Sequence, residues 1–257
     1  MANKYVDFIT DEHLITCISE LYEKYYNAKV SFSKKNLYKN KVDIFKMLFD
    51  KKFNNLSDEQ LINKEIERQV DRTIVNAIGT FHERILAGVK NFEKVDAGID
   101  IKSKDDKIFI ELKNKHNTIK GEDSKSIFMK LLGEIEKHPN SKAYFARILD
   151  TKSTNKEWSF THKKVKFENK NVFIISGDQL YKIVTGNDNS LVRLYQTLPK
   201  AIDDYLETKE PDDLCENIYS TALVELQEDT EKSGREIIDE ITYSNYNYYL
   251  GFDKLNK

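Results

Sequence analysis

The chain has 257 residues, of which 39% are hydrophobic and 33% are charged, and it contains only 3 prolines. This length allows a sizeable buried core, and the composition suits a helix-rich globular protein and argues against disorder. The formal net charge of -2 is the balance of 41 basic and 43 acidic residues. Because the two signs can segregate on different faces, this balance does not exclude nucleic acid as a partner.

Cysteine content and hydropathy predict the cellular setting. Cys17 and Cys215 lie far apart and form no CxxC pair, so we expect neither a disulfide framework nor a zinc cluster. No apolar run approaches the roughly 20 residues that span a bilayer, and the N-terminus lacks a basic start followed by an apolar core. We therefore predict a cytoplasmic protein with no membrane partner.

The first part of the chain is predicted to be helical. Apolar residues at helical spacing indicate one helix over residues 11–28 and a second over residues 42–53. A polar stretch over residues 34–40 separates them. Nothing in this pattern points to a chemical role.

A third and longer helix is predicted next. Ser57 and Gln60 fit a capping box, in which the side chain of each residue meets the backbone N–H of the other. The apolar stripe of this helix runs over residues 61–89, and Gly79 would allow a break in it. We expect this helix to lead directly into the element that follows.

Residues 98–118 predict a β-hairpin. Ile, Phe and Leu recur at alternate positions over residues 99–103 and 108–114, and the charged residues 104–107 form the turn between them.

Two carboxylates meet across this hairpin. Symmetric closure of the turn places Asp100 opposite Glu111, and facing side chains in an antiparallel pair have Cβ atoms only ~5 Å apart. Lys113 shares a face with Glu111 because side chains alternate along a strand. Two unpaired carboxylates this close repel each other. The pattern therefore predicts a divalent cation between them and a lysine beside it.

The elements after the hairpin predict the fold class. A helix over residues 123–138, ended by Pro139, is followed by strands over residues 142–149 and 172–176. A strand, helix, strand order after an antiparallel hairpin gives a mixed central sheet flanked by helices, an α/β (α+β) arrangement. Further helices are predicted beyond it, over residues 177–184 from a second capping box at Ser176, then over 189–206 with an interruption at Pro199, 212–226 and 233–241.

Residues 151–171 form the most basic stretch of the chain, with aromatic residues among the lysines. Lysines near a duplex release counterions from phosphates and add affinity that does not depend on sequence. Lys163 and Lys164 are therefore candidate DNA contacts. The alternative is a solvated hairpin.

Asp100, followed on the next strand by Glu111-Leu112-Lys113, is similar to the core of PD-(D/E)XK nucleases, with Ile99-Asp100 in the place of Pro-Asp. Other Asp/Glu-x-Lys triplets occur in the chain, but only Glu111 lies in an apolar strand that follows an Asp-bearing one. The longer strings ELKNKHNT, over residues 111–118, and IGTFHE, over residues 78–83, resemble type II restriction endonucleases that cut GGNCC or GGWCC sites.

This resemblance implies a single nuclease domain over residues 1–257 with a restriction-endonuclease-like core. A helical N-terminal part over residues 1–56, a catalytic core over 57–186 and a helical C-terminal part over 187–257 would make up the domain. It also implies a Mg²⁺-dependent enzyme that cuts double-stranded DNA at a fixed sequence. A symmetric site suits a homodimer, and a restriction enzyme implies a cognate DNA methyltransferase in the same system.

The resemblance also assigns roles to residues. Asp100, Glu111 and the backbone carbonyl of Leu112 would hold one or two Mg²⁺ ions. Lys113 would orient the attacking water and neutralise charge that develops on the phosphate. Glu83 would be a third carboxylate or a ligand through water, although a surface glutamate paired with Lys or Arg is the commoner case.

Further DNA contacts are expected on either side of this site. His82 would touch the scissile phosphate or adjoining DNA, and a structural imidazole is the alternative. Donors suited to phosphates or base edges continue the catalytic strand, where the alternative is a solvated loop; they are Lys115, His116, Asn117 and Thr118.

Three other functions stay open. A repair or junction nuclease of the same superfamily would carry the same residues but cut without a fixed sequence. A DNA-binding module would keep the basic stretch without cleaving. A structural protein would only display the charged hairpin on its surface.

Overall fold

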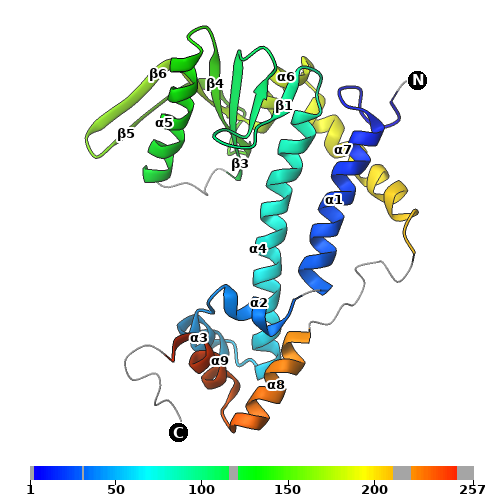
Figure 1. Ribbon diagram of the computed structural model, residues 1–257, viewed down its shortest axis with the longest axis vertical. Helices are drawn as coiled ribbons and strands as arrows, with labels where there is room; N and C mark the ends of the chain where they lie inside the picture. The colour runs from blue at the N-terminus through cyan, green and yellow to red at the C-terminus, as the bar shows by residue number, and fades with distance from the viewer. Residues whose placement is uncertain (1–2, 31, 116–120, 211–220, 248–257) are drawn as a thin grey trace. The chain divides into compact units, whose positions relative to one another are not determined.

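The computed structural model describes residues 3–30, 32–115, 121–210 and 221–247 (Figure 1). Contacts divide the chain into two compact units, Met1–Leu21 with Asn76–Lys209, and Tyr22–Val75 with Glu210–Lys257. The division falls inside the helices α1 (Asp11–Val30) and α4 (Asp58–Ala87). The prediction of a single nuclease domain over residues 1–257 stays a prediction.

The strands of the described residues form one six-stranded mixed sheet in the order β1-β2-β3-β4-β6-β5. Pairing is parallel between β3 and β4 and between β4 and β6, and antiparallel elsewhere. This confirms the predicted fold class. The strands are β1 (Phe92–Lys94), β2 (Ile101–Ser103), β3 (Ile108–Lys115), β4 (Lys142–Leu149), β5 (Asn155–His162) and β6 (Val165–Ser176).

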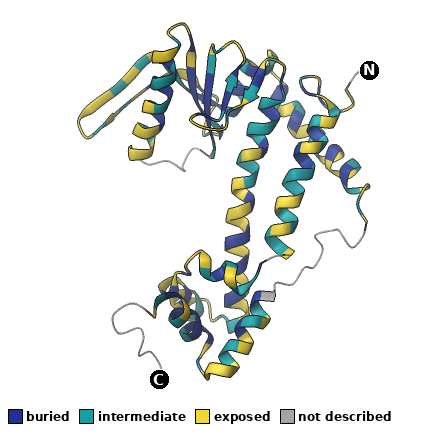
Figure 2. Cartoon of the chain, viewed as in Figure 1, coloured by how far each residue is buried: buried dark blue, intermediate teal, exposed yellow. Residues whose placement is uncertain are grey.

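Helix α5 (Gly121–Lys137) covers one face of this sheet and contacts β3, β4, β5 and β6 (Figure 1). Its stripe of Ile127, Phe128, Leu131 and Ile135 is buried against the strands. Figure 2 draws the buried residues of the chain in dark blue. The ring of Phe128 meets those of Trp158, Phe160 and Phe167 edge-on. The apolar face of the helix, which recurs every 3.6 residues, thus packs on the apolar face of the strands, which recurs every two residues.

The long helix before the sheet begins as the sequence predicts. Ser57 N donates to Gln60 Oε1 at 3.0 Å and Gln60 N donates to Ser57 Oγ at 3.2 Å, so the capping box forms. The helix α4 then continues through Gly79 without a break. It does not lead directly into the hairpin, because the short strand β1 intervenes and pairs with β2.

Other local predictions need correction. The second capping box is absent, because the Ser176 hydroxyl makes no cap bond and accepts from Thr154 N at 2.9 Å instead. Pro199 lies inside α7 (Ser190–Leu206) and does not interrupt it. The buried Leu194, Ala201 and Tyr205 of this helix stabilise it, which offsets the roughly 3 kcal/mol that an interior proline costs. Helix α6 (Gly177–Thr185) precedes it.

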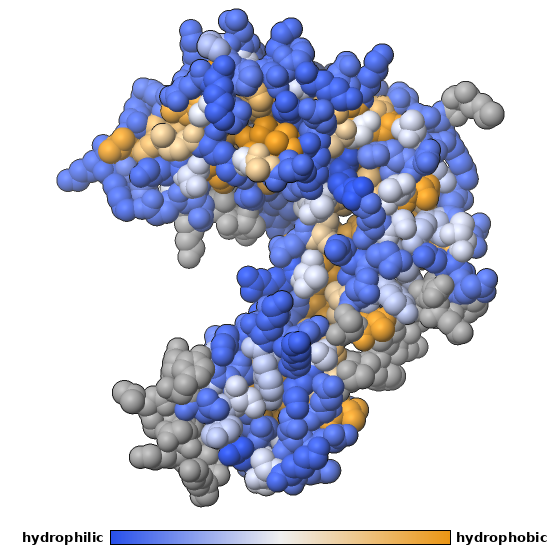
Figure 3. Space-filling view, viewed as in Figure 1, coloured by the Kyte–Doolittle hydropathy of each residue, from blue (hydrophilic) through white to orange (hydrophobic). Residues whose placement is uncertain are grey.

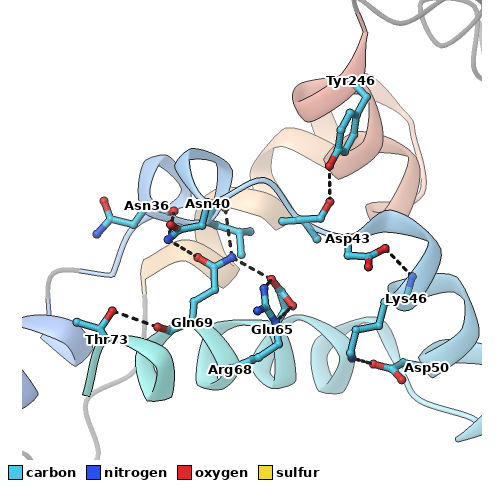
Figure 4. Close-up of polar contacts among 12 residues, drawn as sticks. Asn36, Asn40, Asp43, Lys46, Asp50, Glu65, Arg68, Gln69, Thr73 and Tyr246 are labelled. Atoms are coloured by element: carbon cyan, nitrogen blue, oxygen red, sulfur yellow. Dashed lines mark hydrogen bonds and ion pairs between the residues drawn. The ribbon is translucent and has the colours of Figure 1, made fainter. Parts of the chain in front are cut away.

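The second unit contains α2 (Lys34–Lys39), α3 (Ile44–Phe53), α8 (Thr221–Ser233) and α9 (Ile237–Tyr246). The polar stretch over residues 34–40 is therefore largely helical. The buried Gln69 of α4 accepts a hydrogen bond from Asn40 Nδ2 at 2.9 Å, as Figure 4 shows. It also donates to Leu37 O at 3.3 Å, so the two bonds stabilise the C-terminal end of α2. Within the described residues, we find no helix with the length and apolarity to cross a membrane.

Candidate active site

The hairpin forms in the predicted register. Ile101 pairs with Ile110 and Lys102 with Phe109. Asp100 lies one residue before β2, and its N donates at 3.0 Å to Ile110 O, the carbonyl of the residue that pairs with Ile101. The described strand pairing therefore ends at Ile101, and the facing pair of Asp100 and Glu111 stays a prediction, although the charge of Glu111 acts on Asp100. The sequence could predict the two strand pairs because the side chains alternate with a period of two and the turn length sets which residues face each other.

The Asp100 carboxylate is anchored to the opposite strand. Leu112 N donates to Asp100 Oδ2 at 2.6 Å. In an antiparallel pair, the N–H and C=O groups of one residue are directed to the same side of the strand. The Leu112 carbonyl is therefore directed to the same edge as its N–H, beside Asp100.

Asp100 lies in an electrostatic environment that disfavours its charge. The pKa of Asp100 is raised to about 6, mainly by burial. The Leu112 amide and Lys113 lower this pKa, and the charges of Glu111 and Glu83 raise it. Two other carboxylates thus act on Asp100. A divalent cation bound between these carboxylates would offset the repulsion between their negative charges. This arrangement of charges is typical of a metal site.

Glu111 is buried, with only 3% of its side chain exposed, and it has two ammonium partners. Lys113 Nζ lies 3.3 Å from Glu111 Oε1, and Lys130 Nζ lies 2.8 Å from Glu111 Oε2. The first partner was predicted from the strand period. Lys130 was not, because only the packing of α5 on β3 brings it to the site. Its sole signal in the sequence is its position next to the apolar stripe of α5.

Glu83 lies near this group while it is paired elsewhere. Lys94 Nζ of β1 donates to Glu83 Oε2 at 2.8 Å, and the carboxylate still acts on the pKa of Asp100. Both the pairing with lysine and the proximity to the carboxylates are therefore present. The role of Glu83 as a ligand stays a prediction.

His82 is occupied by a structural contact. Its Nδ1 lies 2.9 Å from the hydroxyl of Tyr181 in α6, and burial lowers the pKa of His82 to about 4. The imidazole is therefore neutral at physiological pH. This geometry matches the structural alternative, and a DNA contact by His82 stays a prediction.

The predicted DNA contacts after the catalytic strand are described only in part. Lys115 is the last residue of β3. His116, Asn117 and Thr118 lie outside the described residues.

Lys163 and Lys164 form the two-residue turn between β5 and β6, where His162 pairs with Val165. Both lysines have positive φ, 47° and 66°, which is the type I′ turn that Asn and Gly favour. Lys163 is ion-paired with Glu122 at the start of α5. In Figure 3 this hairpin, at the left, carries both hydrophilic and hydrophobic residues on its surface.

The donor set fits a divalent cation that keeps part of its water shell. Among the described residues, no three His, Cys, Asp or Glu side chains gather as metal ligands. Two carboxylates, Asp100 and Glu111, and the Leu112 carbonyl provide oxygen donors only. Oxygen donors in small number suit Mg²⁺, which retains several waters.

A mixed sheet flanked by helices, with the Asp100 carboxylate bonded to Leu112 N of β3, is consistent with a restriction-endonuclease-like fold. The model of the Eco47II restriction endonuclease family matches residues 6–207, and the chain belongs to this family of type II restriction endonucleases. Over 98% of its length it is 39% identical to the whole of the type II restriction enzyme Sau96I of Staphylococcus aureus. It is also 32% identical to the type II restriction enzyme Eco47II of Escherichia coli, over 79% of this chain and 89% of that enzyme.

Family membership decides among the functions that the sequence left open. The protein is a sequence-specific endonuclease that acts on double-stranded DNA. Membership also generally implies the use of a divalent metal.

Proposed function

We propose that this enzyme uses Mg²⁺ to cut double-stranded DNA at a GGNCC or GGWCC site, with Asp100, Glu111 and Lys113 at the catalytic centre. The observation that carries the proposal is the bond of the Asp100 carboxylate to the Leu112 amide, next to the buried Glu111 whose charge acts on Asp100. The sequences of residues 78–83 and 111–118 support the choice of site.

The two carboxylates and the Leu112 carbonyl would bind the metal. When bound, Mg²⁺ supplies charge that polarises the scissile phosphate and lowers the pKa of an attacking water. Lys113 Nζ lies 3.3 Å from Glu111 Oε1. The long, flexible side chain of Lys113 would move from this oxygen to the phosphate when DNA binds. Its ammonium then orients the water and neutralises charge on the phosphate.

The remaining roles are proposed on the same basis. Glu83 joins the site as a third carboxylate, with Lys94 as its present partner. Lys115, Lys163 and Lys164 bind phosphates, and His116, Asn117 and Thr118 contact the duplex beside the cut. The enzyme acts as a homodimer, because a two-fold symmetric site is matched by a two-fold symmetric protein. A cognate methyltransferase protects the host DNA, and the cytoplasm is where this pair would work.

A digest of a sequenced plasmid tests the substrate. Wild-type enzyme with Mg²⁺ should give discrete fragments whose ends map to GGNCC or GGWCC. EDTA should abolish these fragments, because the ligands alone cannot activate water. A metal-dependent smear would contradict the fixed site, and fragments that persist in EDTA would contradict the metal.

Charge removal at the β5–β6 turn tests the DNA contacts. Lys163→Asn with Lys164→Gly removes both ammonium groups and places the two favoured residues in the type I′ turn, so misfolding does not explain a loss. We expect weaker binding to specific and non-specific duplexes alike, with the slope of log K against log salt reduced by about 1 per lysine.

The matched control is Lys107→Ala with Lys137→Ala, which removes two exposed lysines of the same unit, each paired with a local acid. This variant should bind as wild type does. Equal salt slopes for all three proteins would show that the turn does not touch phosphates.

A further inference from the structure

Lys130 makes the shorter of the two contacts to the buried Glu111. Its Nζ lies 2.8 Å from Oε2, whereas Lys113 Nζ lies 3.3 Å from Oε1. Charge-assisted N–H···O bonds are typically 2.7–2.9 Å long. The firm partner of this carboxylate is therefore the lysine of the neighbouring helix.

The position of Lys130 is set by the packing of α5. Ile127 and Leu131, three residues before it and one after it, are buried against the sheet. Glu134, which lies one turn further along α5, is paired with Lys137 at 2.8 Å. Lys130 pairs with Glu111 of β3. The burial of Ile127 and Leu131 against the sheet fixes the backbone of Lys130.

The two lysines contact different oxygens and come from different elements. Lys113 is on the strand that carries Glu111 and is assigned to the substrate during cleavage. A carboxylate buried to this extent needs a charged partner at all times. Lys130 can remain on Oε2 while Lys113 leaves Oε1.

We propose that Lys130 is a positioning residue of the cleavage reaction: it holds the Glu111 carboxylate in one orientation while Lys113 moves to the scissile phosphate. This inference rests on the proposed function, since it needs Glu111 to be a metal ligand. It adds a residue that acts through Glu111 and touches neither DNA nor metal. Partners of metal ligands that act in this way typically change metal affinity or activity 10- to 100-fold.

The test compares Lys130→Met, which keeps the stem without the charge, with Lys130→Arg, which keeps the charge. We expect Lys130→Met to lower the single-turnover cleavage rate about 10- to 100-fold, with the Kd for DNA in EDTA within about twofold of wild type. It should also need about tenfold more Mg²⁺ alone to reach the same thermal shift. Lys130→Arg should recover most of both losses.

Lys137→Ala is the matched control, because it removes an exposed lysine from the same helix, and it should behave as wild type. If Lys130→Met does not fold, Lys130→Gln retains a hydrogen-bond donor and should separate rate from DNA affinity in the same way. Lys130→Met that cleaves at the wild-type rate, or that loses DNA binding in step with cleavage, would overturn the proposal. A cleavage rate of Lys130→Arg as low as that of Lys130→Met would also overturn it.

Failure of this inference can be told apart from failure of the proposed site. If the proposed site is correct, Glu111→Ala should abolish cleavage whether or not Lys130 has the proposed role. An active Glu111→Ala overturns the site and with it the role of Lys130. An inactive Glu111→Ala beside a fully active Lys130→Met overturns the role of Lys130 alone.

Discussion

Asp100→Asn should abolish cleavage and, in the absence of metal, make the protein more stable above about pH 6. The loss of a metal ligand removes several kcal/mol of transition-state stabilisation, so we expect the rate to fall roughly 10³-fold or more. The asparagine can still accept the bond from Leu112 N. Activity and stability should change in opposite directions, because the charge of Asp100 would bind the proposed cation but is disfavoured in the fold without it.

The pH dependence follows from the raised pKa of Asp100. Its value is 3.8 in an ordinary environment and about 6 in the fold. Below about pH 4 both states are protonated, and as the pH rises from 4 to 6 the fold loses stability because the unfolded chain releases this proton first. Asparagine stays neutral, so its advantage should appear over that range and persist above it.

The size of the gain is up to about 2 kcal/mol, from 1.36 kcal/mol per pKa unit with a discount for partial exposure. Denaturant unfolding in EDTA at pH 4 and pH 8 measures it. Asp106→Asn is the control, because Asp106 lies in the turn of the same hairpin with Lys102 as partner, and it should cleave normally without a gain. Lower stability of Asp100→Asn at pH 8 would contradict the raised pKa of Asp100.

Lys113→Ala should lower the cleavage rate about 10²- to 10³-fold, the usual effect of removing one donor that stabilises the transition state. The fold should survive, because Glu111 retains its contact with Lys130. Binding of the specific duplex in EDTA should stay within a few-fold of wild type. A gel-shift titration and a single-turnover digest on the same preparation measure the two quantities.

Lys107→Ala is the control for this variant, because it removes an exposed lysine from the turn of the same hairpin. It should cleave at the wild-type rate. If Lys113→Ala loses DNA affinity as much as it loses rate, then Lys113 binds the ground state of the DNA and is not specific to the transition state.

The parts of the fold that could be predicted are those set by neighbours in sequence. The capping box of Ser57 and Gln60 depends on two side chains three residues apart. The hairpin register depends on turn length and on a period of two, and therefore the pairing of Ile101 with Ile110 and the contact of Lys113 with Glu111 could be predicted.

The parts that could not be predicted depend on distant partners. Strand β1 has only three residues and exists because β2 offers it a pairing edge. Helix α2 is polar, and the buried Gln69 of another helix bonds to its Leu37 carbonyl. Helix α7 tolerates Pro199 because its buried residues outweigh the local cost.

Short motifs and strand alternation were sufficient to predict the class of protein and the strands of the hairpin, because both act over a few residues. The surroundings of the predicted site residues depend on tertiary packing. Packing explains three contacts that the sequence did not predict. Lys130 of α5 contacts Glu111 of β3. Glu83 pairs with Lys94, and His82 contacts the hydroxyl of Tyr181. These contacts join residues far apart in the chain, and such contacts follow from how helices pack on a sheet.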